Sequence, residues 1–336
     1  MMINPDFGIS AVMIFLSSFL ITFFVTPVLI RKMFARGLVG QDMNKQGKPK
    51  VAELGGIPII LGVSLAISTS IFILTYIGYL VFDLPILLAG TLTILLVGFI
   101  GIVDDLVGWK KGIRQWQHTF FPLFAALPLM AVQAGTDYVV LPFVGGVSIG
   151  IFYSLLLVPV GITGAANAFN MLAGFNGLEA GLGIIIVSTL TLIAFFTGST
   201  EAVIIGIALI GALLAFLYYN KFPAKVFGGD SLTLMVGAGI ATISILGNME
   251  KIGVTIIALH WIELVFKARK KFQSECFGIP DKNGVLHAPK ELGSLTHLIL
   301  RYKPMPEKQL VGTILLAQTI VAATVFFLFW FKLFYF

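Results

Sequence analysis

Ten long apolar stretches alternate with shorter polar segments along the chain. They cover residues 7–30, 55–82, 84–103, 118–136, 147–167, 180–200, 202–220, 231–249, 252–266 and 309–331. Nine contain no Asp, Glu, Lys or Arg, and the shortest, 252–266, carries Glu263 near its end. An α-helix needs about 20 apolar residues to cross a bilayer, whereas a barrel strand needs about 10 of alternating polarity. The pattern predicts an all-α polytopic membrane protein with ten transmembrane helices.

Two of the polar segments carry signals for β-hairpins. Residues 135–149 form two β-prone runs around Gly145-Gly146, which predicts a small hairpin with its tight turn at these glycines. The longest polar segment, 267–308, contains Asn283-Gly284 as a second turn signal. We expect residues 1–336 to form a single integral membrane domain, with 267–308 as a long loop within it.

Composition narrows the class of protein further. Hydrophobic residues make up 58% of the chain and charged residues only 11%, with a mean hydropathy of +0.99. A soluble domain of this size needs roughly a quarter of its residues charged. These values exclude a soluble globule, a disordered chain and a nucleic-acid-binding module. The one cysteine, Cys276, excludes an intramolecular disulfide framework and a cysteine-based metal site.

The basic residues indicate which helix ends face the cytoplasm. With ten spans, residues 31–54, 104–117, 168–179, 221–230 and 267–308 share one side of the membrane, and they hold 20 of the 22 Lys and Arg. Cytoplasmic loops are enriched in Lys and Arg. We expect these segments to be cytoplasmic and both termini and the 135–149 hairpin to lie on the outside. The protein itself is expected in the cell membrane or, in a eukaryote, in the endoplasmic reticulum membrane.

Most acidic residues lie at the predicted cytoplasmic helix ends or loops. A transporter usually places ionisable groups near the bilayer midplane, where only His260 and Glu263 come close in this chain. An acid-lined surface at the membrane face suits an enzyme that joins a soluble charged substrate to a lipid. A transporter of lipid-linked sugars or nucleotide sugars is the competing hypothesis.

Asp104 and Asp105 end the third apolar stretch. Neighbouring helical residues point in different directions, so the two carboxylates are expected to have divided roles, one near a metal or a lysine and the other near a lipid phosphate. The alternative is that both are solvated acids without a function. This alternative is disfavoured because the helix dipole makes a helix C-terminus unfavourable for negatively charged side chains.

The segment NAFNMLAGFNGLEAG, residues 167–181, is rich in Asn and Gly. Asn167 and Asn170 share a helix face, and Gly174 and Gly177 allow a ligand to approach the backbone closely. Amide oxygens suit Mg²⁺. Helix capping and a turn are the alternative explanation.

A third cluster, Phe227-Gly228-Gly229-Asp230, directly precedes the eighth apolar stretch. It indicates either a plain helix N-cap at Asp230 or a Mg²⁺ or phosphate site at a helix N-terminus. Phe227 is a candidate for stacking on a base or for anchoring in lipid. With the many cytoplasmic cations, these clusters favour Mg²⁺-dependent chemistry on a diphosphate beside a membrane.

Three motifs of the sequence resemble those of a known enzyme family. GFIGIVDD, NAFNMLAGFNGLEAG and VFGGDSL, in this order, resemble the polyprenyl-phosphate N-acetylhexosamine-1-phosphate transferases, and most closely their archaeal and eukaryotic UDP-GlcNAc:dolichyl-phosphate GlcNAc-1-phosphate transferase branch. The resemblance runs from about residue 7 to 331. It implies transfer of a sugar phosphate from a UDP-sugar to a polyprenyl phosphate with release of UMP, with Mg²⁺ as cofactor and Mn²⁺ as an alternative. A homodimer is one expected form of the assembly.

The resemblance also implies roles for matching residues. Asn170 and Asp230 resemble the metal ligands, Asp104 and Asp105 the acidic pair near the lipid phosphate, Asn176 and Phe227 the uracil contacts, and Glu53 a residue near the sugar. The chain lacks the basic Arg-His-Arg cluster of the last cytoplasmic loop. The candidate cations for the diphosphate are therefore Arg269, His287, His297 and Arg301. A family lysine matches His118, so His118, Lys111 and Arg114 are further candidates for phosphate binding.

Overall fold

The computed structural model describes residues 5–76, 82–107, 115–141 and 145–333. The longer helices are α1 (Pro5–Arg36), α2 (Gly56–Tyr76), α3 (Leu84–Val107), α6 (Val158–Met171), α7 (Leu178–Thr197), α8 (Thr200–Asn220), α9 (Asp230–Leu246) and α13 (Glu307–Trp330). The shorter helices are α4 (Gln115–Ala125), α5 (Leu127–Ala131), α10 (Glu250–Ile256), α11 (Ala258–Arg269) and α12 (Leu295–Tyr302), and a π-helical turn, Tyr153–Leu157, leads into α6.

The strands form three small antiparallel sheets. They pair β1 (Val39–Gln41) with β2 (Lys50–Ala52), β3 (Tyr138–Leu141) with β4 (Gly145–Ser148), and β6 (Val285–His287) with both β5 (Ile279–Pro280) and β7 (Met305–Pro306). Nothing in the hydrophobic pattern predicted the β1–β2 hairpin, because its strands are only three residues long.

Seven helical stretches in the described residues are long and apolar enough to cross a membrane. They are α1, α2, α3, the π-helical turn with α6, α7, α8 and α13. The chain is therefore an all-α polytopic membrane protein. The other three expected spans are also helical but shorter or broken: Phe120–Ala131, α9, and the α10–α11 pair.

The two broken spans have local causes. Pro128 lies in the first turn of α5, where its ring disfavours continuation of α4. Between α10 and α11, Ile257 leaves the helical region with φ −89° and ψ 26°. The indole N–H of Trp261 donates to the Val254 carbonyl oxygen across this break, at 2.9 Å. Ten spans remain a prediction.

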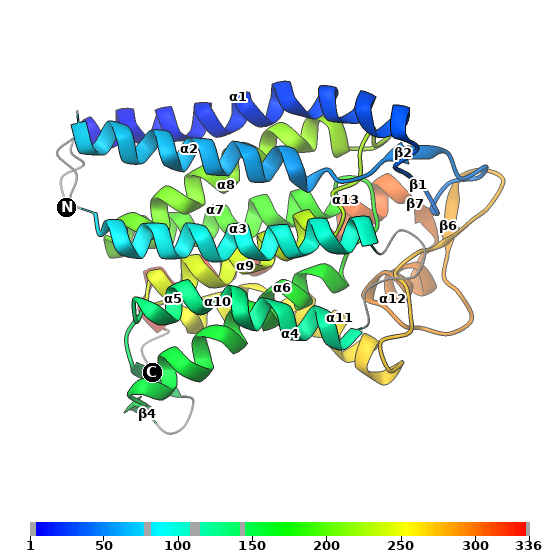
Figure 1. Cartoon of the computed structure of the whole chain (residues 1–336). Coiled ribbons are helices and arrows are strands. Elements are labelled where there is room, and N and C mark those ends of the chain that lie inside the picture. The colour runs from blue at the N-terminus through cyan, green and yellow to red at the C-terminus, as the bar shows by residue number, and fades with distance from the viewer. Residues whose placement is uncertain (1–4, 77–81, 108–114, 142–144, 334–336) are drawn as a thin grey trace.

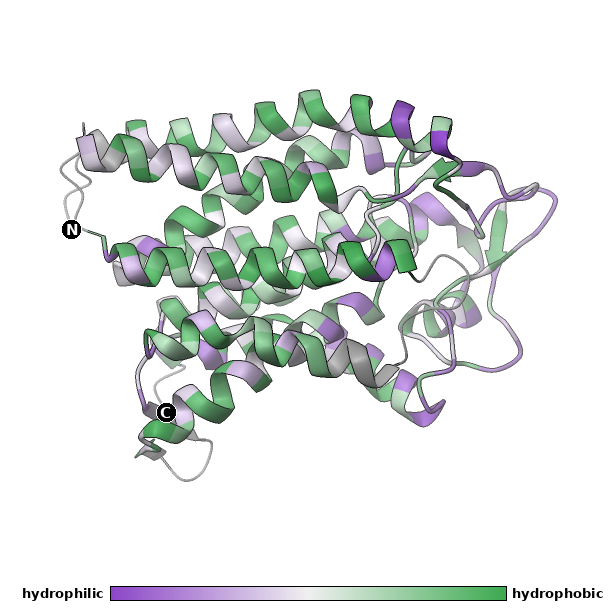
Figure 2. Ribbon diagram, in the orientation of Figure 1, coloured by the Kyte–Doolittle hydropathy of each residue, from purple (hydrophilic) through white to green (hydrophobic). Residues whose placement is uncertain are grey.

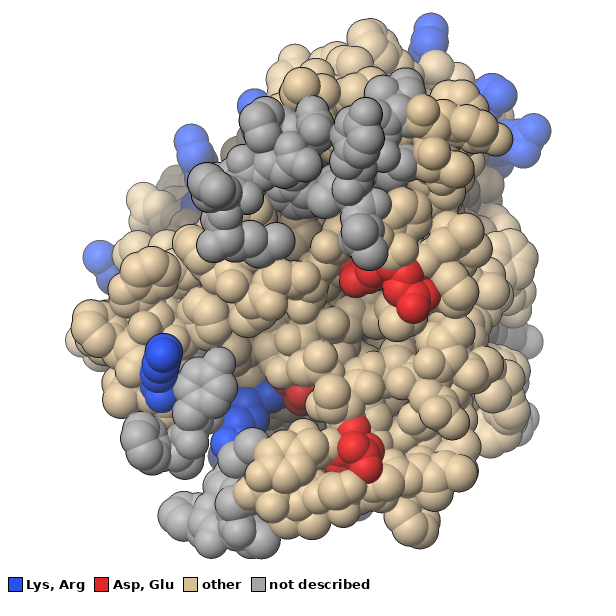
Figure 3. All heavy atoms as spheres, turned by 90° about the vertical axis from the view of Figure 1, so that its left-hand side faces the viewer, with Lys and Arg blue, Asp and Glu red and all other residues tan. Residues whose placement is uncertain are grey.

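Figure 1 shows the long helices side by side, with several strands and long connecting segments at one end, the loop end. This loop end carries β1, β2, β6, β7 and α12, whereas β4, the start of α1 and the end of α13 lie at the opposite, hairpin end (Figure 1). Hydrophilic residues gather at the loop end, and the helices between are mainly hydrophobic (Figure 2). Seen face-on, the hairpin end is mostly uncharged (Figure 3).

Helix α9 occupies the centre of the bundle. Every residue from Ser231 to Leu246 is buried. A Cβ at Gly101 of α3 would lie 2.5 Å from the Asp230 carbonyl oxygen, so only glycine permits this approach of α3 to the start of α9. Gly237 of α9 likewise faces the backbone of Ala165 in α6. Small residues are the usual means of close helix packing in membranes. The start of α9 is thereby fixed beside α3 and α6.

Both predicted hairpins are present, with one correction. Asn283-Gly284 lies in the β5–β6 turn, and Gly284 adopts the φ of +76° for which glycine is suited. In the other hairpin Gly145 pairs with Leu141 and Gly146 with Val140. The prediction of a turn at these two glycines is therefore wrong, because both belong to β4. The residues between β3 and β4, 142–144, lie outside the described residues.

Candidate active site

A cavity of about 280 Å³ lies at the loop end, between the β1–β2 hairpin, the end of α6 and the start of α9. Four of the predicted site residues line it, namely Glu53, Asn170, Phe227 and Asp230. The other described candidates do not line this cavity: Asp104, Asp105, Asn176, Arg269, His287, His297 and Arg301.

A short strand-like pairing sets Glu53 beside Phe227. Ala52 forms a parallel bridge with Val226, the Phe227 N–H donates to the Ala52 carbonyl oxygen at 2.8 Å, and the Gly55 N–H donates to the Phe227 carbonyl oxygen at 2.9 Å. The Glu53 carboxylate lies against Gly40, where a side chain would collide with it. The β1–β2 hairpin and the segment before α9 therefore form one wall.

Asn170 and Asp230 converge on the cavity from α6 and α9. The Thr233 hydroxyl donates to Asn170 Oδ1 at 2.8 Å and orients the amide. An amide oxygen has two lone pairs, so Asn170 Oδ1 retains the capacity for one further ligand. Among the described residues, no three His, Cys, Asp or Glu side chains group as a metal centre. An amide oxygen with a carboxylate, completed by phosphate oxygens, is a donor set that suits Mg²⁺.

The cavity is rich in carboxylates. Asp42, Glu53, Glu179 and Asp230 all line it, and its described lining includes no Lys or Arg. A diphosphate bound here would be repelled by this wall at close range. The site therefore fits a diphosphate only together with positive charge from a cation or from a segment beyond this lining.

Asp105 caps helix α9 from the neighbouring helix α3. Its Oδ1 accepts from the Asp230 backbone N–H at 2.8 Å, and its Oδ2 accepts from the Ser231 N–H at 3.1 Å and the Ser231 hydroxyl at 2.8 Å. The N-cap position itself is Gly229, without a side-chain cap. The alternative reading of Asp230 as a plain N-cap is therefore wrong, because Asp105 supplies the cap. Asp104 is buried in α3, at 4% exposure.

Asn176 is held in a buried network next to the cavity. Its Oδ1 accepts from Lys45 Nζ at 2.8 Å and from the Ala224 N–H at 2.7 Å, and its Nδ2 donates to Asp42 Oδ2 at 3.1 Å. Lys45 also forms an ion pair with Asp42, and its Nζ lies 3.4 Å from Glu307 Oε2. These bonds occupy the amide of Asn176. Its contact with a uracil therefore remains a prediction, and the contact would require the amide to exchange some of these partners.

Two further polar residues near the cavity, Asn44 and Glu179, are not among the candidates that the sequence predicted. Asn44 donates to the Gly174 carbonyl oxygen at 2.9 Å and accepts from the Gly278 N–H at 3.2 Å, so it joins three separate segments. Glu179 Oε1 accepts from the Gly174 N–H at 2.5 Å and lines the cavity. Glu179 lies within the Asn- and Gly-rich motif, which was a usable signal. Asn44 follows the β1 strand, which no pattern revealed.

The candidate cations of the long loop have other partners or exposed positions. Arg301 donates to the carbonyl oxygens of Pro289 and Lys290, at 3.0 and 2.8 Å. His287 Nε2 lies 3.3 Å from Asp281 Oδ2 on the β5–β6 hairpin, and Arg269 is exposed at the end of α11. Lys111 and Arg114 lie outside the described residues, as does the side chain of His118.

His297 stabilises the loop as a neutral side chain. Its Nδ1 accepts from the Gly293 N–H at 3.2 Å, which leaves Nε2 as the donor to the Phe277 carbonyl oxygen at 3.0 Å. Burial lowers the pKa of His297 below the usual 6.5, opposed by the bond to the Phe277 carbonyl. A protonated Nδ1 could no longer accept from Gly293.

We expect acid to loosen this loop. Because the folded pKa of His297 is lowered, the unfolded chain binds the proton more tightly, and the stabilisation present above pH 6.5 is lost as the pH falls below that value. Amide hydrogen exchange at residues 274–297 should therefore speed up between pH 7.5 and 5, after correction for intrinsic rates. His297→Asn should abolish the step, and a step that persists in this variant would assign it to another group.

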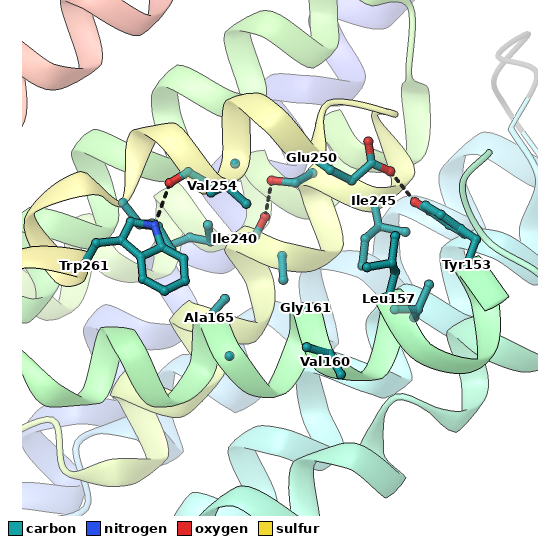
Figure 4. A pocket seen from close by; sticks show the side chains of 16 residues that line it. Tyr153, Leu157, Val160, Gly161, Ala165, Ile240, Ile245, Glu250, Val254 and Trp261 are labelled. Carbon is teal, nitrogen blue, oxygen red and sulfur yellow. Dashed lines mark hydrogen bonds between the residues drawn. The ribbon is translucent and has the colours of Figure 1, made fainter. Parts of the chain in front are cut away.

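An apolar groove of about 300 Å³ runs along α6 between α9, α10 and α11. Gly161 and Ala165 of α6 face Ile240 and Val254 across it, and Trp261 lies at one end (Figure 4). The other end carries a hydrogen bond from the Tyr153 hydroxyl to Glu250 (Figure 4). The same helix α6 carries Asn170 beyond the Trp261 end of the groove, so groove and cavity are joined by one element.

Comparison with known proteins shows which family the chain resembles. Residues 87–248, which include Asn170 and Asp230, match the model of glycosyl transferase family 4. A provisionally named UDP-N-acetylglucosamine–dolichyl-phosphate N-acetylglucosaminephosphotransferase of Saccharolobus solfataricus is 36% identical over 301 residues, 88% of this chain and 89% of that protein. A protein of the same name from Sulfolobus acidocaldarius is 35% identical over 295 residues, 87% and 88% of the two chains.

The similarity extends to bacterial proteins over a shorter part of the chain. A phospho-N-acetylmuramoyl-pentapeptide-transferase of Limosilactobacillus reuteri is 32% identical over 250 residues, 72% of this chain and 76% of that protein. With the archaeal relatives aligned along nearly the whole length at more than 30% identity, the chain belongs to glycosyl transferase family 4.

Proposed function

We propose that the protein transfers N-acetylglucosamine-1-phosphate from UDP-N-acetylglucosamine to dolichyl phosphate, or another polyprenyl phosphate, and releases UMP. This reaction would start the synthesis of a lipid-linked oligosaccharide. The names of the two archaeal relatives support this donor and acceptor. The observation that carries the proposal is the convergence of Asn170 and Asp230 on a carboxylate-lined cavity at one end of a membrane-spanning bundle.

The chemistry follows from the cavity and the groove. An oxygen of the lipid phosphate forms a bond to the β-phosphorus of the donor, and the bond from that phosphorus to the α–β bridging oxygen breaks, so UMP leaves with the electron pair. Mg²⁺ or Mn²⁺ held by Asn170 and Asp230 would supply positive charge to the diphosphate. Catalysis of this kind depends mainly on positioning and charge stabilisation.

The apolar groove along α6 is suited to the polyprenyl chain. Gly161 and Gly164 leave open space on its wall, since an added Cβ at either would meet nothing within 4 Å. Asn170 lies six residues further along the same helix than Gly164, about 9 Å at 1.5 Å per residue. A chain lying in the groove would thus bring its phosphate towards the cavity.

We further propose ten spans with both termini outside and the cavity in the cytoplasm. The 20 basic residues on one side of the ten-span arrangement support this orientation. The helical pairs α4–α5 and α10–α11 would serve as the fourth and ninth spans. His260 and Glu263, the ionisable groups expected to come near the bilayer midplane, are both fully buried. Glu263 accepts hydrogen bonds from Ser294 and Leu295 at the start of α12.

Topology is open to a direct labelling test. Cysteines at Lys290 and at Tyr138, both exposed, should react from opposite sides of sealed vesicles with a membrane-impermeant maleimide. The native Cys276 is buried, and burial raises its thiol pKa to about 11, so its background labelling should be low. Labelling of both sites from one side would contradict the orientation.

The activity itself is tested with purified protein. Radiolabelled UDP-N-acetylglucosamine and other UDP-sugars are offered with dolichyl or undecaprenyl phosphate, with and without Mg²⁺ or Mn²⁺, and the lipid products are resolved. We expect a lipid diphosphate sugar and UMP, and the reverse reaction should regenerate UDP-N-acetylglucosamine from UMP. A protein that moves a labelled nucleotide sugar across vesicles without forming a lipid product would be a transporter instead.

A further inference from the structure

A second cavity adjoins the carboxylate-lined cavity, and Phe277 lines both of them. This second cavity, of about 470 Å³, is formed by the long loop 267–308. Its wall includes Gln273, Glu275, Lys270 and Glu291, and Lys270 Nζ lies 2.6 Å from Glu291 Oε2. Phe277 is the residue common to the two linings. Its partly exposed ring therefore stands at the border between the cavities.

The two cavities differ in chemistry. The first offers carboxylates and the Asn170 amide, which suit a diphosphate with its metal. The second offers an amide, carboxylates and an ammonium group, which can donate to and accept from hydroxyl groups. A molecule with a diphosphate and a neutral, hydroxyl-rich ring would match both cavities together. It would have to pass the Phe277 ring.

The backbone at Phe277 is fixed from four directions. Cys276 Sγ donates to the Met171 carbonyl oxygen at 3.1 Å, and the Thr296 hydroxyl donates to the Cys276 carbonyl oxygen at 2.5 Å. His297 and Asn44 bind the Phe277 carbonyl and the Gly278 N–H, as described above. This border is thus rigidly held, as a substrate-positioning wall must be.

The ring also closes against the Asn- and Gly-rich segment. A Cβ added at Gly174 would lie 2.7 Å from Phe277 Cε1, and Gly174 adopts a φ of +102°. Glycine at this position thus leaves room for the aromatic ring at the cavity edge. The Phe277 ring packs against Gly174, where the chain turns after the helix that carries Asn170. The ring therefore lies between the carboxylate-lined cavity and the second cavity.

We propose that Phe277 is a specificity-determining residue of the donor substrate. Its ring packs against the apolar C–H face of the sugar, which occupies the second cavity while the uridine diphosphate occupies the first. Aromatic rings favour such contacts because they bury apolar area and present a negative face to C–H groups. This inference rests on the proposed function, since it concerns the sugar of the proposed donor.

A comparison of UDP-N-acetylglucosamine binding with UMP binding distinguishes a contact with the sugar from a contact with the nucleotide or a role in the fold. Titration calorimetry with Mg²⁺ should show that Phe277→Ala weakens UDP-N-acetylglucosamine binding on the order of tenfold, while UMP, which has no sugar, binds within about twofold of wild type. Phe277→Tyr should bind both ligands normally. Phe272→Ala, an aromatic residue on the same loop that lines neither cavity, is the matched control and should change neither.

Other results would overturn the inference. An equal loss of UMP and UDP-N-acetylglucosamine binding would make Phe277 part of the nucleotide site or of the fold, and unchanged binding of both would remove it from recognition. If Phe277→Ala does not fold, Phe277→Leu can be used to compare UDP-N-acetylglucosamine binding with UMP binding. We then expect a smaller loss of UDP-N-acetylglucosamine binding. Turnover of the wild type is measured separately. A wild-type protein that binds the donor but forms no lipid product would contradict the proposed transferase activity. The role of Phe277 would still be tested by comparing how Phe277→Ala changes the binding of UDP-N-acetylglucosamine and of UMP.

Discussion

Replacing Asp230 by asparagine is expected to lower turnover by about a thousandfold or more while leaving the fold intact. The substitution removes the charge of one of the two proposed metal ligands, and metal charge contributes several kcal/mol to the stabilisation of a phosphoryl transition state. The helix start should survive, because Asp105 and not the Asp230 side chain caps α9. Turnover and the thermal midpoint in detergent are the two measurements.

Asp83→Asn is a matched control for this experiment. Asp83 lies before α3 and accepts from the Ile86 N–H at 3.0 Å, so it too is an aspartate at a helix start, away from the cavity. Asparagine can keep that cap, and we expect wild-type turnover and stability. Near-normal turnover of Asp230→Asn at low Mg²⁺ would refute the assignment of Asp230 as a metal ligand.

Asp105→Ala is expected to damage stability and activity together. It leaves three donors at the start of α9 without their carboxylate, at a cost of about 3 kcal/mol, and it releases the backbone that positions Asp230. The thermal midpoint should fall by several degrees, with turnover lost even where the protein remains folded. Thermal unfolding followed by activity at low temperature separates the two effects.

Ser231→Ala provides a graded comparison. It removes one of the three donors that Asp105 binds and should cost only about 1 kcal/mol. The family resemblance places the Asp104–Asp105 pair near the lipid phosphate, and a direct contact there would give a defect in the use of the lipid substrate. If Asp105→Ala raised the KM for the lipid alone, with unchanged stability, Asp105 would be a direct lipid contact and its capping role would be secondary.

The seven spans seen in the described residues, and the positions of Asn170 and Asp230 at helix ends, could be predicted because their signals are local. A charge-free run of about 20 residues has few alternatives to a transmembrane helix, and the motifs around Asn170 and Asp230 place both residues at helix ends. The turn at Gly145-Gly146 was misplaced because glycine occurs both in turns and in short strands. The breaks at Pro128 and Ile257 were not anticipated, since apolar runs do not reveal helix interruptions.

The remaining features depended on hydrogen bonds to backbone groups that the local sequence pattern does not reveal. Asp105 was expected near a metal, a lysine or a lipid phosphate, and its hydrogen-bond partners at the start of α9 lie about 125 residues further along the chain. His297 and Arg301 looked like free cations in the sequence, yet both bind backbone groups of their own loop. The hydrogen-bond partner of a side chain cannot be identified from the local sequence pattern when that partner is a backbone atom of another segment.

The bond between Asn176 and the last long helix has a consequence for biosynthesis. The Asn176 N–H donates to Glu307 Oε1 at 2.8 Å, and Glu307 is the first residue of α13. During translation the early helices enter the membrane well before residue 307 leaves the ribosome. The segment with Asn176 must therefore wait for the end of the chain before it acquires its final partner. A nascent chain released before residue 307 would hold its earlier helices in the membrane while the Asn176 N–H lacked its Glu307 partner.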